Sequence, residues 1–338
     1  MAEIVHIPLG GGGGSATDRF EATVIIGNTA EGDPAASQAL PFNYRGDTGN
    51  GDELVAAIAA ALGSGQSTRI RVRPGAYDLS GQTLPISIPS NVILEGSGTQ
   101  TLFFGSDTSR EVFDVQESAI VRDFYIFVPS EGETPAGEYV MRFAQNSLGE
   151  RIRIQVGDGG GGQDSDSLQD LFRIWGNDVR LLDVIGDVQS GVSEGSPTIS
   201  CVGIGPRQSG PTIQRATVRL TTLGLGAQLF VSSQALDCLL DVSGDGGRIG
   251  NVNGTRLNAR IMCSFLTPGG AVPNFVDWGA FDSIAEITGH GDGVDLSDYA
   301  TISGFGNNLR IQFDGASGGG AVSVTGEFNA IGGGIQNG

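Results

Sequence analysis

Short runs of alternating hydrophobic and polar residues cover most of the chain. Arg69 to Arg73 alternates strictly, with Ile70 and Val72 on one face, which predicts a half-buried strand. Pro74-Gly75 follows and predicts a turn. Comparable runs, separated by Gly, Asp, Asn and Ser, predict further strands at residues 22–26, 91–95, 101–104, 112–115, 119–121, 124–128, 139–143, 151–156, 179–185, 212–220, 235–242, 255–262, 283–288, 307–313 and 321–324.

One segment has the character of a helix. Asp52 is the expected N-cap, the run from Leu54 to Leu62 is apolar and rich in Ala, and Gly63 is expected to end the helix at its C′ position. The prediction is a helix over residues 52–62. Because it is short and apolar on most faces, it should lie against a larger core.

The predicted strands recur at a loose interval. The steps between equivalent points are 30, 28, 33, 25, 21 and 25 residues, and these points are Val121, Arg151, Val179, Thr212, Asp237, Asn258 and Ser283. Two-residue Asn-Gly or Asp-Gly turns between matched strands are mostly missing, which argues against a sandwich of hairpins. The pattern predicts an all-β solenoid, a parallel β-helix, with insertions in its corner loops. One such loop is 157–163, followed by the acidic Asp164, Asp166 and Asp170.

The first 46 residues differ from the rest. Gly10 to Gly14 is an unbroken glycine run, and most of the segment is polar, so it can bury little by itself. We therefore expect an extended N-terminal arm over residues 1–46 and a β-helix domain over residues 47–338. The N-terminus has neither the basic nor the apolar region of a secretion signal, so we expect assembly in the cytoplasm.

Charge and cysteine content limit the partners. The 338 residues include 38 acids and 19 bases, all of them Arg, which gives a net charge of −19. This charge repels nucleic acid and anionic lipid. The longest apolar run, Leu54 to Leu62, is too short for membrane insertion. The three cysteines form no CxxC pair and there are only two histidines, so we expect neither a structural metal nor a cofactor.

A family resemblance lies in the region that begins with the predicted helix. Residues 52–62, Thr68 to Leu79 with its Pro-Gly-x-Tyr sequence, and Ile88 to Gly98 with its Gly-x-Gly corner resemble the opening of pectate-lyase-like right-handed parallel β-helix proteins. The resemblance implies that the helix covers the open end of the solenoid. With a Gly-rich arm, the chain looks like a phage tailspike, fibre or virion decoration protein. Such proteins are typically homotrimers that attach to the particle through the N-terminal segment.

Two motifs near the C-terminus are weak candidates for chemistry. Gly289-His290-Gly291 and Arg310-Ile311-Gln312 resemble parts of the polygalacturonase signature, but the Asp-Asp pair of that signature is missing. Glycoside hydrolysis needs two carboxylates, so His290 has nothing to assist. The acids Asp292, Asp295 and Asp298 form a cluster of a kind that can bind Ca²⁺, although a solvated acidic loop is favoured.

A second set of acids lies near the middle of the chain. On neighbouring coils such acids can form a glycosidase groove, and here they are Glu111, Asp114, Glu117 and Asp123, with Arg110 and Arg122 beside them. An acidic protein also exposes acids without any such role, and we assign no catalytic residue. Trp175 is a possible platform for a sugar ring, with a core or interface position as the alternative. Trp278 is the other tryptophan.

These observations favour a non-enzymatic virion protein. We expect a homotrimeric tailspike or fibre whose residues 1–46 dock on other virion proteins and whose flank recognises a host surface polysaccharide. The alternatives are a head decoration protein of the same fold and a polysaccharide depolymerase, either a lyase or a glycoside hydrolase.

Overall fold

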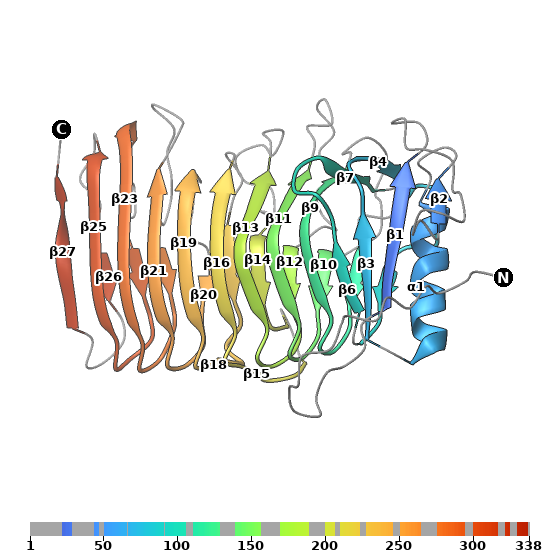
Figure 1. Cartoon of the computed structure of the whole chain (residues 1–338). Helices are drawn as coiled ribbons and strands as arrows, with labels where there is room; N and C mark the ends of the chain where they lie inside the picture. The colour runs from blue at the N-terminus through green and yellow to red at the C-terminus, as the bar shows by residue number, and fades with distance from the viewer. Residues whose placement is uncertain are drawn as a thin grey trace, which may run out of the picture.

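The computed structural model describes most of the chain in short ranges, which are residues 22–28, 44–46, 51–65, 67–90, 92–105, 111–128, 139–156, 170–188, 200–206, 210–223, 228–245, 251–264, 276–294, 300–316, 322–324 and 330–336. Within these ranges the chain forms one helix and a stack of strands that pair in parallel (Figure 1). In the described residues no helix is long and apolar enough to cross a membrane.

The first sheet runs the whole length of the stack, in the order β2-β1-β3-β6-β9-β11-β13-β16-β19-β21-β23-β25-β27. Beside this path, β4 pairs with β7, and β7 with β9. Its strands are β1 (Ala22–Asn28), β2 (Tyr44–Gly46), β3 (Thr68–Val72), β4 (Gly75–Asp78), β6 (Val92–Glu95), β7 (Thr101–Phe104), β9 (Ile120–Val128), β11 (Leu148–Val156), β13 (Arg180–Val188), β16 (Thr217–Leu223), β19 (Leu239–Asp245), β21 (Asn258–Ser264), β23 (Ile284–Val294), β25 (Asn308–Ala316) and β27 (Ala330–Gln336).

The second sheet lies behind the first, in the order β26-β24-β22-β20-β17-β14-β12-β10-β8-β5. Its strands are β5 (Ile86–Ile88), β8 (Phe113–Val115), β10 (Tyr139–Phe143), β12 (Asp170–Ile174), β14 (Ser200–Ile204), β17 (Gln228–Val231), β20 (Asn251–Val252), β22 (Val276–Trp278), β24 (Ala300–Ile302) and β26 (Val322–Val324). From β8 onward the chain alternates between the two sheets, and β15 (Ile213–Gln214) pairs with β18 (Ala235–Leu236) at one corner. This is the predicted parallel β-helix.

The core is built of side chains that stack from one coil to the next. Parallel, in-register pairing places equivalent residues of successive coils above each other. Along each strand, every second side chain points into the core. One inward row of the first sheet is aliphatic along six strands and consists of Val184, Leu220, Val242, Ile261, Ile287 and Ile311. Close to the N-terminal end, buried rings replace the aliphatic side chains, and these are Tyr77, Phe103, Phe113 and Phe124.

The helix α1 (Asp52–Ser64) covers the N-terminal end of the stack, as predicted (Figure 1). Its buried side chains belong to the core and follow helical spacing, namely Leu54, Ala57, Ile58 and Ala61. Both predicted caps were wrong. The N-cap is Gly51, with φ 74°, and Asp52 instead accepts a hydrogen bond from Gln82 Nε2 at 2.5 Å. The helix continues past Gly63 to Ser64, and Gly65 is its C-cap, with φ 64°, because glycine adopts this left-handed conformation without strain.

Coil lengths vary more than the sequence pattern predicts. Leu181 stacks on Val218, 37 residues later, whereas Leu240 stacks on Ala259, 19 residues later. The predicted strands 119–121 and 124–128 form a single strand, β9, bent at Asp123, whose φ is 62°. Within the predicted arm, β1 pairs with both β2 and β3. Part of residues 1–46 therefore belongs to the first sheet.

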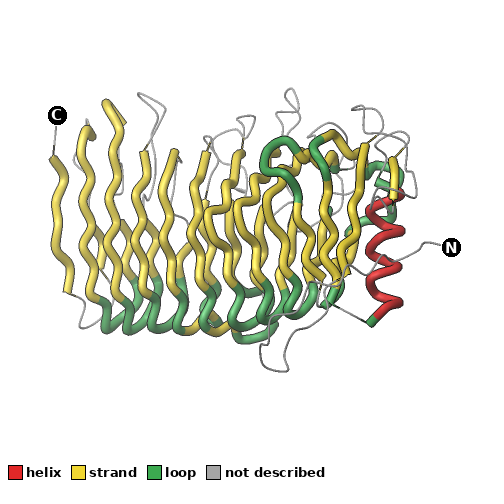
Figure 2. The backbone as a smooth tube through the Cα atoms, viewed as in Figure 1, coloured by secondary structure: helices red, strands yellow, loops and turns green. Residues whose placement is uncertain are grey.

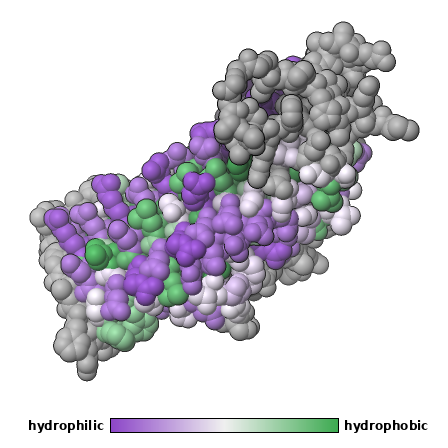
Figure 3. Space-filling view, turned by 60° about the horizontal axis from the view of Figure 1, so that its bottom comes forward, coloured by the Kyte–Doolittle hydropathy of each residue, from purple (hydrophilic) through white to green (hydrophobic). Residues whose placement is uncertain are grey.

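The corner between the second and the first sheet is a regular ladder. Figure 2 shows most of the described loops along this edge. At this corner, one residue of each successive coil from Ser118 to Asp282 has a positive φ, and its N–H donates to a carbonyl of the next coil, for example from Asp178 to Gln214 at 2.9 Å. Arg215 binds Asp178 through two contacts of 2.6 Å, and Arg256 binds Asp237 in the same way at 2.6 and 2.7 Å. Hydrophilic residues form a band along the stack, interrupted by hydrophobic patches (Figure 3).

Candidate functional site

The outer face of the second sheet carries a cluster of charged and aromatic side chains. We call it the arginine–aromatic cluster, and its members are Asp114, Tyr139, Arg142, Asp170, Arg173 and Trp175. Parallel register aligns Asp114 with Arg142 and Arg142 with Arg173 on β8, β10 and β12. Tyr139 is aligned with Asp170 at the start of β10 and β12. Equivalent positions of three successive coils therefore meet on one face.

Two ion pairs hold the cluster together. The Nε of Arg142 donates to Asp114 Oδ1 at 2.9 Å, and its Nη2 donates to Oδ2 at 2.5 Å. The Nε of Arg173 donates to Asp170 Oδ2 at 2.8 Å. Asp170 and Arg173 are 0% and 4% exposed, whereas Asp114 and Arg142 are 14% and 36% exposed. The first pair is therefore accessible from solution and the second is buried beside it.

The ring of Tyr139 lies near both guanidinium groups. The carbon Cζ of Arg142 lies 5.2 Å from the centre of the Tyr139 ring, and that of Arg173 lies 5.6 Å from the same centre. Arg173 also lies 6.0 Å from the ring centre of Trp175, which is partly exposed. These distances are in the range of cation–π contacts.

Tyr139 keeps its proton at neutral pH. Burial raises the pKa of its hydroxyl to about 12; the positive charge of Arg142 opposes this shift, and the negative charge of Glu111 adds to it. The hydroxyl can therefore donate a hydrogen bond, but it does not act as a base near pH 7.

This geometry is suited to binding rather than to hydrolysis. A glycosidase needs one carboxylic acid that donates a proton and a second carboxylate that attacks or activates water. Asp114 and Asp170 each accept charge-assisted hydrogen bonds from an arginine instead. Tyr139 and Arg173 are each only 4% exposed, so the accessible part of the cluster consists of the Trp175 ring and the Asp114–Arg142 pair. An accessible ring and an accessible guanidinium group are features that can bind a sugar ring.

The sequence matches no protein-family model and no curated protein. Among solved structures, the chain is similar to the A-module of the Azotobacter vinelandii mannuronan C-5 epimerase AlgE6, with 14% identity, 87% of this chain and 97% of that chain covered, and a TM-score of 0.30. It is also similar to tailspike protein 3 of bacteriophage CBA120 (13% identity, 84% and 57% covered, TM-score 0.31) and to ORF18 of Geobacillus virus E2 (14%, 86% and 59%, 0.33).

The four acids considered from the sequence do not meet at one place. Asp114 belongs to the arginine–aromatic cluster. Glu111 lies close enough to Tyr139 for its negative charge to raise the pKa of the tyrosine hydroxyl. Glu117 is exposed in a corner loop. Asp123 lies on the first sheet, where it accepts from Arg151 Nε at 2.6 Å and from Nη2 at 2.8 Å. The structure thus does not form the groove of stacked acids that we considered.

The other candidates are also separated. Trp175 adjoins the cluster, whereas Trp278 is a fully buried core residue. His290 and Asp292 lie in β23, but their side chains are outside the described part, as are Arg110, Asp295 and Asp298. Arg310 lies 3.5 Å from Glu286 on the surface of the first sheet. Among the described side chains, no three His, Cys, Asp or Glu residues are grouped so that they could hold a metal ion.

Sequence reasoning missed four members of the cluster, which are Tyr139, Arg142, Asp170 and Arg173. Asp170 was expected in an acidic loop, but it is the first residue of β12 and fully buried. A signal was present, because Tyr-Val-Met-Arg-Phe in β10 and Asp-Leu-Phe-Arg-Ile in β12 both place Arg at the fourth position.

Proposed function

We propose that the chain is a non-enzymatic virion structural protein, a subunit of a homotrimeric spike or fibre, and that it binds a host surface polysaccharide through the arginine–aromatic cluster. The observation that supports this most directly is the placement of partly exposed Trp175 beside Arg173, which an ion pair with Asp170 holds in place. Residues 1–46 would attach the subunit to other virion proteins.

The physical reason lies in what a sugar ring requires. Its C–H face packs on an aromatic ring, while its hydroxyl groups need hydrogen-bond partners of fixed direction. Arg142 is fixed by two bonds to Asp114, so little side-chain entropy is lost when it donates to a ligand. A long, straight flank also suits a polymer, since a polysaccharide can follow several coils.

The test is binding of the full chain to a panel of bacterial surface polysaccharides by titration calorimetry. We expect Trp175→Ala to weaken binding of the recognised polysaccharide about tenfold or more, as truncation of a central Trp does in interfaces. The matched control is Phe305→Ala, which removes an exposed aromatic ring on a distant corner loop and should leave the affinity unchanged. Equal effects of both variants would refute the assignment of the site.

Two further measurements separate the alternatives. Shortening of the polysaccharide by the purified protein, lost in Glu111→Ala or Asp114→Ala, would show a depolymerase instead. Antibody-gold labelling of particles distinguishes a tail position from a head decoration protein, and absence of label would remove the virion proposal. A monomeric mass in light scattering at micromolar concentration would contradict the trimer.

A further inference from the structure

Exposed hydrophobic side chains gather on the C-terminal half of the first sheet. In the described part of the chain five large hydrophobic side chains are exposed, and three of them lie on the outer face of β19, β21 and β23. These are Leu239, Met262 and Ile284, which are 46%, 38% and 59% exposed. A fourth, Phe305, lies at the corner before β25. Single exposed hydrophobic residues are ordinary, whereas several on one face indicate a contact surface.

Charged residues border Leu239 and Ile284 on both sides. Register aligns these two with uncharged Thr217 and Asn258 on β16 and β21. Two residues later, on the strands, a row alternates in sign from coil to coil and consists of Arg219, Asp241, Arg260 and Glu286. Two residues earlier, at the corner, a row with the same order of signs consists of Arg215, Asp237, Arg256 and Asp282.

Each of these four coils therefore carries a stripe of one charge sign, and the sign changes at every step along the stack. All eight charged side chains are at least partly exposed. The pattern is limited to these coils, because the coil before them has Asp178 at the corner but Arg180 on the strand, and the coil after them has Gly306 at the corner. Its centre lies between β19 and β21. We call the three rows on these four coils the striped face.

The signs decide how a second copy of the chain can lie on the striped face. In a closed ring of parallel subunits, equal coils lie at equal height, so each stripe would meet a stripe of its own sign. An antiparallel copy, related by a two-fold axis between β19 and β21, brings opposite signs together. Asp241 then faces Arg260 of the second copy, and Arg219 faces its Glu286. Complementary charges favour association, while like charges oppose it.

We propose that the striped face binds a second copy of this chain in antiparallel orientation. Leu239 and Ile284 supply the apolar centre of the contact, and the two charged rows supply its polar rim. The inference goes beyond the proposed function and does not rest on it. Its consequence for a trimeric spike is that the three-fold axis lies on another face, since parallel subunits cannot match their charges here.

The first experiment measures the mass of the full chain by sedimentation velocity over a range of protein concentrations. In the antiparallel pair, the acidic stripe that contains Leu239 meets the stripe of Arg256 and Arg260. Leu239→Arg should therefore weaken the contact roughly tenfold or more, and Leu239→Asp should weaken it less. Leu62→Arg is the matched control, because it changes an exposed Leu of α1 at the other end of the stack. The thermal midpoint of each variant checks that the fold is kept.

The second experiment tests the orientation with single cysteines and a mild oxidant. The antiparallel contact places Thr217 opposite Ile284 of the second copy. A mixture of Thr217→Cys and Ile284→Cys should therefore form disulfide-linked dimers on a non-reducing gel, whereas each variant alone should not. In a parallel ring each variant would instead cross-link with itself. The wild-type chain gives the background from the native cysteines.

The outcomes separate this contact from the proposed trimer. A chain that also forms trimers would show masses of three and six copies, and a chain that does not would show masses of one and two. In both cases Leu239→Arg should remove the larger species. The proposal is overturned by a wild-type mass that never doubles with concentration, by equal behaviour of Leu239→Arg and Leu62→Arg, or by self-cross-linking of the single-cysteine variants.

Discussion

Removal of the Phe103 ring should test the packing of the N-terminal coils most directly. Phe103 is fully buried, and its ring centre lies 5.7 Å from that of Tyr77, 5.4 Å from that of Phe113 and 5.3 Å from that of Phe124. Truncation of a buried Phe to Ala costs about 3–5 kcal/mol. Because three partner rings lose a contact at once, we expect Phe103→Ala to cost about 5 kcal/mol, at the upper end.

The control is the next residue along the chain. Phe104 points to the outer face, is partly exposed, and has one ring contact, 6.1 Å from Phe127. Phe104→Ala should therefore cost only about 1–2 kcal/mol. The assay is urea-induced unfolding followed by circular dichroism. The free energies of unfolding of the two variants are compared with the same slope against urea concentration. Equal losses in Phe103→Ala and Phe104→Ala would refute the inward and outward alternation of β7, and with it the core we describe.

Two other predictions concern the corner and the glycines. A Cβ atom on Gly304 would lie 1.7 Å from the carbonyl oxygen of Ala280, so Gly304→Ala should lower the thermal midpoint sharply. A Cβ atom on Gly63 of α1 would meet open space, so Gly63→Ala should raise the thermal midpoint slightly. Hydrogen bonds from Arg215 and Arg256 hold the pKa of Asp178 and Asp237 below the ordinary value. The contribution of these two ion pairs to the stability of the fold is therefore present above about pH 4, and it is lost as the pH falls through the lowered pKa values of the two carboxyl groups. The thermal midpoint measured against pH should fall less steeply on the acid side in the double variant Asp178→Asn, Asp237→Asn, and an unchanged slope would contradict this.

The helix and most strands of the first sheet could be predicted because their patterns are strong, although β2, β4 and β27 were not predicted. Strands such as β3 alternate between buried and exposed residues, since their outer face meets solvent. The helix repeats apolar residues at helical spacing from Leu54 to Ala61. Its ends were less predictable, because three glycines, Gly51, Gly63 and Gly65, lie near the boundaries and only two adopt a positive φ.

Several strands of the second sheet could not be predicted. In β12 and β14 all five residues are buried, so no alternation is left to recognise, and each strand is short. The site was missed for a related reason. Its partners come from different coils, and Asp114 and Arg142 are 28 residues apart. The same separation joins Asp123 and Arg151, so an Asp–Arg spacing equal to one coil length was a signal that the sequence contained.

The charges on the outer face of the first sheet explain how the coils keep their register. In one row the residues of successive strands alternate in sign, and these are Arg219, Asp241, Arg260, Glu286 and Arg310. Opposite charges directly opposite each other in a sheet are stabilising, and a slip of two residues would move Arg219 from Asp241 to Leu239 or Ser243. The charges therefore favour the observed register even on this solvated face.

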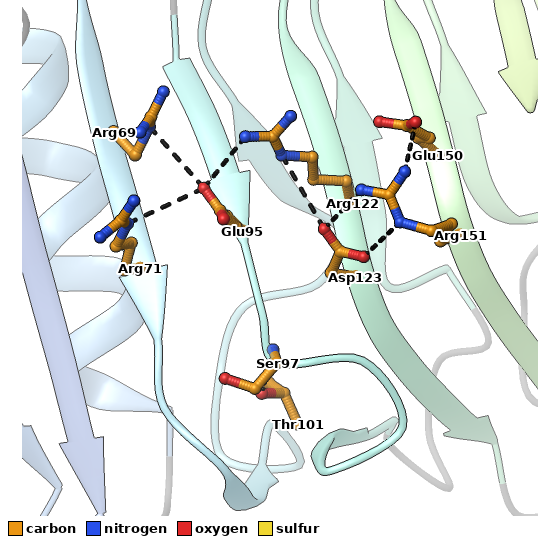
Figure 4. Close-up of polar contacts among 9 residues, drawn as sticks. All are labelled: Arg69, Arg71, Glu95, Ser97, Thr101, Arg122, Asp123, Glu150 and Arg151. Atoms are coloured by element: carbon orange, nitrogen blue, oxygen red, sulfur yellow. Dashed lines mark hydrogen bonds and ion pairs between the residues drawn. The ribbon is translucent and has the colours of Figure 1, made fainter.

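The N-terminal row follows the same rule, through Arg71, Glu95, Arg122 and Glu150, except that Arg69 also lies within reach of Glu95. Both arginines of β3 therefore lie near Glu95 from one side, and Arg122 lies near it from the other (Figure 4). Without the charge of Glu95, three arginines of neighbouring coils would lie close together with equal sign, so this carboxylate favours the observed register at the end of the sheet next to α1.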